Sequence, residues 1–84
     1  MEFFGKLLEE FKKIEEKISE EVRNEFKNCK YDELSQYHFS IGLYIRNNIL
    51  FKKGKIYSGL EKIGYSYDEM SVFLIKLLYL YLNG

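Results

Sequence analysis

The sequence contains no proline and no tryptophan, only one cysteine and one histidine, and no net charge. Without proline, helices can run without the kinks that its ring imposes. The single cysteine, Cys29, excludes a disulfide or a thiolate metal site within one chain. We expect it to be a small core residue rather than a reactive thiol. Thirteen basic side chains balance thirteen acidic ones. Nucleic-acid binding, which relies on excess positive charge, is therefore not expected.

Long hydrophobic runs are also missing. The longest nearly continuous one, residues 71–82, contains Lys76 and is shorter than the roughly 20 residues that a membrane span requires. The first residues lack the basic stretch and apolar run of a secretory signal. We therefore expect a cytoplasmic protein with no membrane contact. Eighty-four residues are enough for a single domain, expected over residues 1–84.

Apolar residues recur every three or four positions from Phe4 to Phe26, which is the period of one helical face. The pattern predicts one long amphipathic helix over residues 2–28. Its other face is charged, and residues 1–33 carry ten acids against seven bases.

Residues 32–50 are predicted to form a second helix with two apolar faces. The narrower face holds Phe39, Leu43 and Leu50, and His38 lies within the main face. A helix that is apolar on two sides is central or lies at an interface.

Two further helices are predicted after a lysine-rich turn at Lys52, Lys53 and Lys55. A short one spans residues 55–63 and ends at Gly64. The last spans residues 67–82 and begins at a capping box formed by Ser66 and Glu69. The fold class is thus all-α: a small helical bundle of three main helices plus one short helix.

One segment of the second helix resembles a known family. Residues 38–48 read H-F-S-I-G-L-Y-I-R-N-N, and Asp68-Glu69-Met70-Ser71 opens the last helix. The pattern H-F-x-x-G-x-x-I-R-N followed by D-x-M-S is similar to that of small bacterial and phage domains of unknown function. The resemblance covers residues 31–83, the motif-bearing helical core, and implies no known activity.

His38, Gly42 and Arg46 follow one another at one-turn spacing. Because glycine costs stability inside a helix, Gly42 predicts a close backbone approach by another helix. Arg46 has three interpretations: an ion pair with Asp68 or Asp32, bonds to carbonyls at a helix end, or a site for an anion. His38 is interpreted as a buried core residue before a catalytic base, and it has no companion ligands for a metal. The candidate ligand or partner residues are His38, Gly42, Arg46, Asn47, Asp68 and Ser71.

Neither catalytic motifs nor a phosphate loop is present, and no cofactor is expected. The favoured hypothesis is a non-enzymatic protein-binding module, such as a small inhibitor, immunity-type or adaptor factor. The alternative is a small-ligand or nucleotide-binding domain that uses Arg46, His38 and nearby tyrosines. Surplus apolar surface also predicts a homodimer. The candidate partner surface comprises Glu15, Glu16, Glu20, Phe39 and Leu43.

Overall fold

The structure is a computed structural model that describes residues 2–51 and 54–84, and every regular element in these ranges is helical. The elements in chain order are α1 (Glu2–Lys17), α2 (Glu20–Asn28), the 3₁₀-helix η1 (Tyr31–Tyr37), α3 (Ile41–Ile45), the π-helical segment η2 (Arg46–Leu50), α4 (Lys55–Lys62) and α5 (Tyr67–Asn83). The all-α prediction is therefore confirmed. Lys52 and Lys53 of the predicted turn lie outside the described residues.

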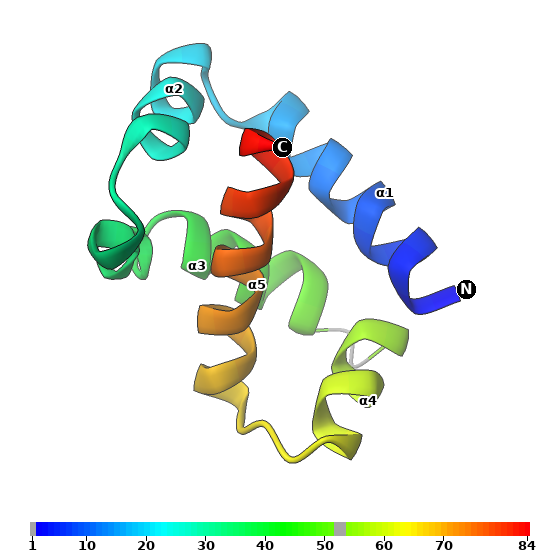
Figure 1. The fold of residues 1–84 in the computed structure, drawn as a ribbon. Coiled ribbons are helices and arrows are strands. Elements are labelled where there is room, and N and C mark those ends of the chain that lie inside the picture. Colours follow the sequence, from blue (N-terminus) through cyan, green and yellow to red (C-terminus); the bar gives the residue numbers. More distant parts are fainter. Residues whose placement is uncertain (1, 52–53) are drawn as a thin grey trace.

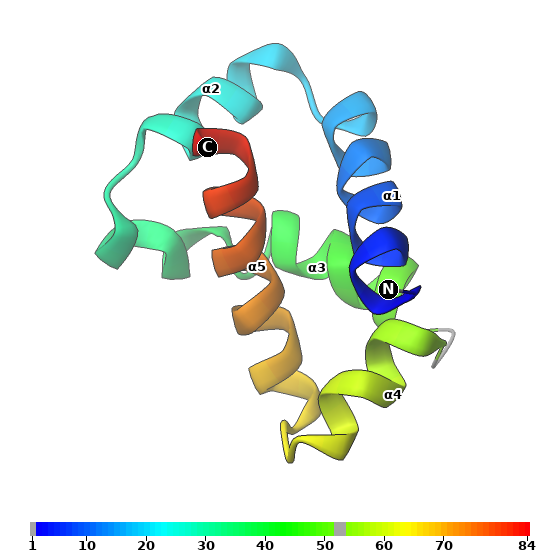
Figure 2. The ribbon, with the colours of Figure 1, turned by 45° about the vertical axis from the view of Figure 1, so that its right-hand side comes forward.

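Helix α5 lies in the middle of the molecule, with α2 and η1 on one side and α1 and α4 on the other (Figures 1 and 2). It packs against α2, η1 and α3, whereas α1 packs mainly against α4. The predicted capping box is present at the start of α5. The Ser66 hydroxyl accepts a hydrogen bond from the Glu69 amide at 3.3 Å, and the Glu69 carboxylate accepts one from the Ser66 amide at 2.9 Å. The hydrogen bond from the Ser66 amide, and after it the Ser66 side chain, lower the pKa of the Glu69 carboxylate.

The prediction of one continuous helix over residues 2–28 is wrong. The helix is interrupted at Ser19. The backbone of Ser19 is extended, and its hydroxyl accepts a hydrogen bond from the Val22 amide at 3.1 Å. Serine followed by Glu20 and Glu21 is a helix start, because the hydroxyl caps a free amide and the acids complement the helix dipole. The sequence does not reveal this interruption, because the apolar period continues on both sides of Ser19.

The prediction of one helix over residues 32–50 is also wrong, because this stretch contains η1, a turn at residues 38–40, α3 and η2. In the π-helical segment each bond spans five residues, so side chains wind more slowly about the axis than in an α-helix. Ile49 and Leu50 are both buried there. Leu50, expected on the second apolar face, is therefore part of the core, whereas Phe39 and Leu43 remain exposed.

The short helix and its glycine end are confirmed. Gly64 has φ +96°, and the Gly64 and Tyr65 amides donate to the carbonyls of Glu61 and Leu60. This is the hydrogen-bond pattern of a Schellman helix end. Gly59, within the helix, lies against the Phe3 ring, and a Cβ there would lie 2.8 Å from two ring atoms. The glycine thus permits the close packing of α1 on α4.

Candidate functional site

A hydrogen-bond network centred on Arg46 connects three elements. Its Nη1 donates to the Ser71 hydroxyl of α5 at 3.3 Å, and its Nη2 donates to the His38 carbonyl after η1 at 3.2 Å. The Ser71 hydroxyl donates in turn to the Asp68 carbonyl at 2.9 Å, and Ser71 is fully buried. Since His38 caps the end of η1, Arg46 fixes the end of that helix to α5.

Gly42 makes room for this network, and its closest contact with α5 is to the Ile75 side chain rather than to the backbone. A Cβ on Gly42 would lie 3.1 Å from Cδ1 of Ile75 on α5 and 3.3 Å from Nη1 of Arg46. Any larger side chain would therefore displace the guanidinium, the α5 contact or both.

Of the three interpretations of Arg46, the bond to a helix-end carbonyl is the one found. No ion pair within the described ranges includes Arg46. Asp68 contributes only its backbone carbonyl, and its side chain is exposed. Asn47 is exposed too, whereas the neighbouring Asn48 amide donates to the Tyr44 carbonyl at 3.0 Å. The network is thus built from a guanidinium, a hydroxyl and carbonyls, without a carboxylate.

An apolar groove of about 670 Å³ lies beside this network, between η1 and α5. The buried Leu34 and Ile75 form its floor. Phe39, at 83% exposure the most exposed of the large apolar side chains described, stands at its edge. The groove is lined by Tyr31, Asp32, Leu34, Ser35, His38, Phe39, Val72, Ile75 and Lys76. We refer to these residues as the η1–α5 groove.

His38 lines this groove and is only half-buried, so the prediction of a buried core histidine is wrong. Its ring meets the Phe39 ring edge-on, with the centroids 4.9 Å apart. The predicted apolar face that contains His38 requires a continuous helix over residues 32–50. Because residues 38–40 form a turn instead, His38 is placed at the groove rather than in the core.

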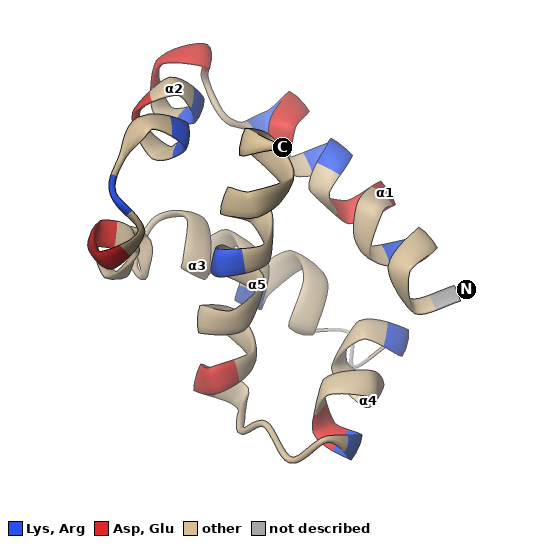
Figure 3. Ribbon diagram, in the orientation of Figure 1, with Lys and Arg blue, Asp and Glu red and all other residues tan. Residues whose placement is uncertain are grey.

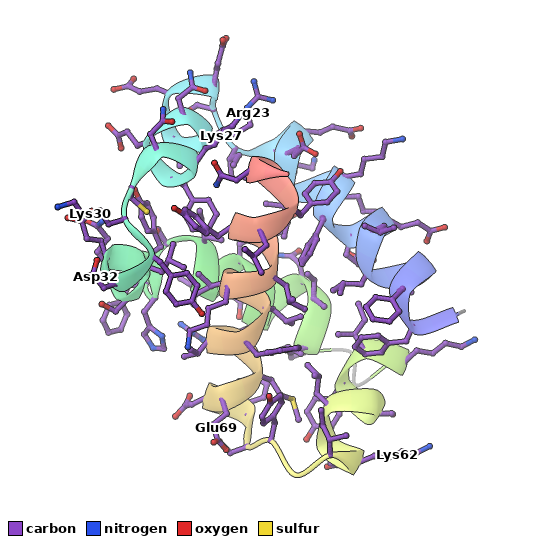
Figure 4. All side chains as sticks on the ribbon, viewed as in Figure 1. Arg23, Lys27, Lys30, Asp32, Lys62 and Glu69 are labelled. Carbon is purple, nitrogen blue, oxygen red and sulfur yellow. The ribbon has the colours of Figure 1, made fainter. Side chains whose placement is uncertain are left out.

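Charged groups of opposite sign line the same groove. The Lys76 ammonium lies 5.8 Å from the centroid of the Tyr31 ring, a cation–π distance. Neither Lys76 nor Asp32 takes part in an ion pair among the residues that the structure describes. Figure 3 shows one basic segment halfway along α5, facing the acidic segment of η1, and Figure 4 labels Asp32 on η1. Sequence reasoning missed Lys76, Val72 and Tyr31 as site residues, because no local period reveals that η1 and α5 lie side by side.

The predicted acidic surface is smaller than expected. Glu15 is half-buried, and its Oε2 lies 3.8 Å from Nη1 of Arg23. Its carboxylate also accepts a hydrogen bond from the Tyr81 hydroxyl of α5. This hydrogen bond, followed by burial, raises the pKa of Tyr81. Glu15 therefore belongs to the contact between α1, α2 and α5, whereas Glu16 and Glu20 are exposed.

Cys29 is half-buried between α2 and η1, and its thiol donates to the Phe26 carbonyl at 3.1 Å. Burial, and then the charge of Glu33, raises the pKa of the thiol. A raised pKa keeps the thiol protonated, which agrees with a packing role. Its carbonyl accepts a hydrogen bond of 2.7 Å from the Tyr79 hydroxyl, so it also helps to hold α2 on α5.

Residues 2–51 and 54–84 contain neither a cluster of metal ligands nor a membrane-spanning helix. No group of three or more His, Cys, Asp or Glu side chains in these ranges is placed to hold a metal ion. None of the described helices has the length and hydropathy needed to cross a bilayer.

The fold and the site define a small all-helical domain with an apolar groove beside the hydrogen-bond network of the half-buried Arg46. The chain belongs to DUF6794, a domain of unknown function, whose family model matches residues 6–82. The match begins within α1 and therefore covers more of the chain than residues 31–83, over which the sequence resembles small domains of unknown function. A comparison with curated proteins found no match, and neither did a comparison with solved structures.

Proposed function

We propose that this protein is a non-enzymatic protein-binding module, such as a small inhibitor, immunity-type or adaptor factor of bacterial or phage origin that acts in the cytoplasm. The supporting observation is the η1–α5 groove with Phe39 exposed at its edge. Aromatic side chains beside apolar pockets are typical of the residues that contribute most to protein interfaces. Exposed Leu43 and Val72 add apolar surface.

Binding accounts for the groove better than catalysis does. Asp32, His38 and Lys76 all line it, but no hydrogen bond joins any two of these side chains in the part of the chain described. A catalytic base is normally held in reach of a nucleophile and oriented by a further group. The nearest ordered polar network uses the His38 backbone carbonyl rather than its imidazole.

A matched pair of variants tests this proposal, because the chain offers two highly exposed phenylalanines. Phe39 borders the groove, and Phe51, 73% exposed, follows η2 and does not line the groove. Tagged wild-type protein, Phe39→Ser and Phe51→Ser would each be used to capture proteins from the native cell. We expect the same specific partner with wild type and Phe51→Ser, and a loss of at least about tenfold with Phe39→Ser. Equal capture by all three would refute the groove as the surface that binds the cellular partner and would leave the exposed Glu16 and Glu20 as its candidate contact. Loss of a cellular activity in a folded His38→Ala variant that still captures the partner would support an enzyme instead.

The volume of the groove supports the alternative, a small-ligand domain. Arg46 does not line the groove, and its guanidinium is bonded to Ser71 and His38. An apolar or aromatic compound therefore fits this site better than a nucleotide phosphate. A thermal-shift screen of nucleotides and aromatic acids distinguishes the two functions, since a ligand that binds only the folded state raises Tm. Stabilisation lost in Val72→Glu, which places an acid in the groove, would support the ligand site.

A further inference from the structure

The η1–α5 groove and the side chain best suited to fill it lie on the same face of the molecule. Phe39 projects into solvent at the edge of the groove, and Leu34 and Ile75 form the apolar floor beside it. A partner of unrelated sequence would need only the groove. An interface between two identical chains related by a two-fold axis needs both features on one patch, because each copy must present what the other accepts.

We propose that the groove is occupied by a second copy of this chain, in a two-fold dimer in which each Phe39 enters the partner's groove. The inference rests on the proposed function, since it requires the groove to be a protein-binding surface. In this dimer the aromatic ring leaves water and covers Leu34 and Ile75 of the other copy. The apolar flank at Leu43 and Val72 is covered at the same time.

The charges of the groove support the same occupant. It holds one acid, Asp32, and one base, Lys76, and neither is ion-paired within residues 2–51 and 54–84. A two-fold axis that passes between the two charges places the Asp32 of each copy opposite the partner's Lys76. The pairing therefore forms twice and leaves no like charges facing each other. A groove with charges of one sign would repel its own copy, whereas a groove with one charge of each sign can pair with it.

Sedimentation equilibrium is the first test. We expect wild-type protein and Phe51→Ser to have twice the monomer mass of 10.1 kDa, and Phe39→Ser to dissociate with a Kd raised by about 30-fold or more. Far-UV circular dichroism must show that Phe39→Ser keeps its helices and melts cooperatively. A wild-type monomer at high concentration, or a Phe39→Ser dimer as tight as wild type, would overturn the proposal.

Charge exchange is the second test, and misfolding cannot imitate its positive result. Asp32→Lys puts two bases in each groove, and Lys76→Glu puts two acids there, so each variant alone should be largely monomeric. Mixed in equal amounts, they should form a one-to-one heterodimer, because both cross-pairs are then of opposite charge. The heterodimer should weaken as salt is raised. Failure to associate on mixing would overturn the pairing of Asp32 with Lys76.

The two proposals can fail separately. If the wild type is monomeric but captures a cellular protein through Phe39, the dimer is refuted and the protein-binding function stands. If it dimerises through Phe39 and captures no other protein, the dimer stands and the binding of a cellular partner is refuted.

Discussion

Gly5 and Gly42 both lie in helices, yet their surroundings are opposite. A Cβ at Gly5 would meet nothing within 4 Å, whereas one at Gly42 would crowd Ile75 and Arg46. Gly42→Leu should therefore lower the free energy of unfolding by about 1–3 kcal/mol through overpacking. Gly5→Ala, the control, should raise it by about 0.5–1 kcal/mol, because glycine costs that much in an open helix. Urea unfolding followed by circular dichroism measures both. A Gly42→Leu protein as stable as wild type would contradict the close contact.

Arg46 is the residue on which η1, η2 and α5 converge. Arg46→Lys should cost about 1–2 kcal/mol of stability, because one ammonium cannot reproduce the planar fork that bonds both Ser71 and the His38 carbonyl. A double-mutant cycle of Arg46→Ala and Ser71→Ala separates the energy of the Arg46–Ser71 hydrogen bond from that of general packing. Additive effects of Arg46→Ala and Ser71→Ala would mean that the 3.3 Å contact contributes nothing to stability.

Tyr81 makes the contact between α1 and α5 sensitive to alkaline pH. Its pKa is raised by the hydrogen bond to Glu15 and by burial, so the folded state holds the phenolic proton more tightly than the unfolded state does. The resulting stability is fully present below the unfolded tyrosine pKa of about 10 and is lost as pH rises through the higher folded value. Tyr81→Phe should remove part of this alkaline loss. The ultraviolet titration of Glu15→Gln should show Tyr81 ionising at lower pH than in wild type.

Ser19 separates α1 from α2, and the break depends on its hydroxyl cap. Ser19→Ala should cost about 1 kcal/mol, since the Val22 amide loses its acceptor. Ser58→Ala, at an exposed position within α4, should be neutral or slightly stabilising, because alanine is the better helix former. Thermal melts of both variants check the difference. Equal Tm values would mean that tertiary contacts alone fix the break.

Local signals in the sequence predicted the ends of helices better than their continuity. The Ser66–Glu69 box and Gly64 placed the start of α5 and the end of α4 correctly, because caps depend on residues a few positions apart. The sequence does not predict the breaks at Ser19 and at residues 38–40, because the apolar period continues through both and indicates continuous helices. The Gly42 contact was predicted from the cost of glycine, but its neighbour Ile75 was not. The groove could not be predicted from the sequence, since it depends on packing between η1 and α5.

At the scale of the whole molecule, the groove and the acidic surface are separate regions that can serve two partners. The groove lies between η1 and α5, whereas Glu16 and Glu20 lie exposed at the junction of α1 and α2. If a second copy fills the groove, the acidic junction becomes the surface available to a cellular partner. Such a partner would present basic side chains, and its binding would weaken with salt.

Charge reversal at the junction tests this arrangement. Glu16→Lys and Glu20→Lys, made singly, should each slow association with the captured partner severalfold at low salt and reduce the dependence of the rate on salt, because exposed charges act chiefly by steering the encounter. Glu61→Lys, the same charge reversal at an exposed position of α4, is the matched control and should bind the partner as wild type does. Surface plasmon resonance at two salt concentrations gives the association rate constant at each concentration. Sedimentation must show that all three variants still form the dimer. Equal slowing by Glu61→Lys would show that only net charge matters. No slowing in Glu16→Lys or Glu20→Lys would mean that the partner binds another face.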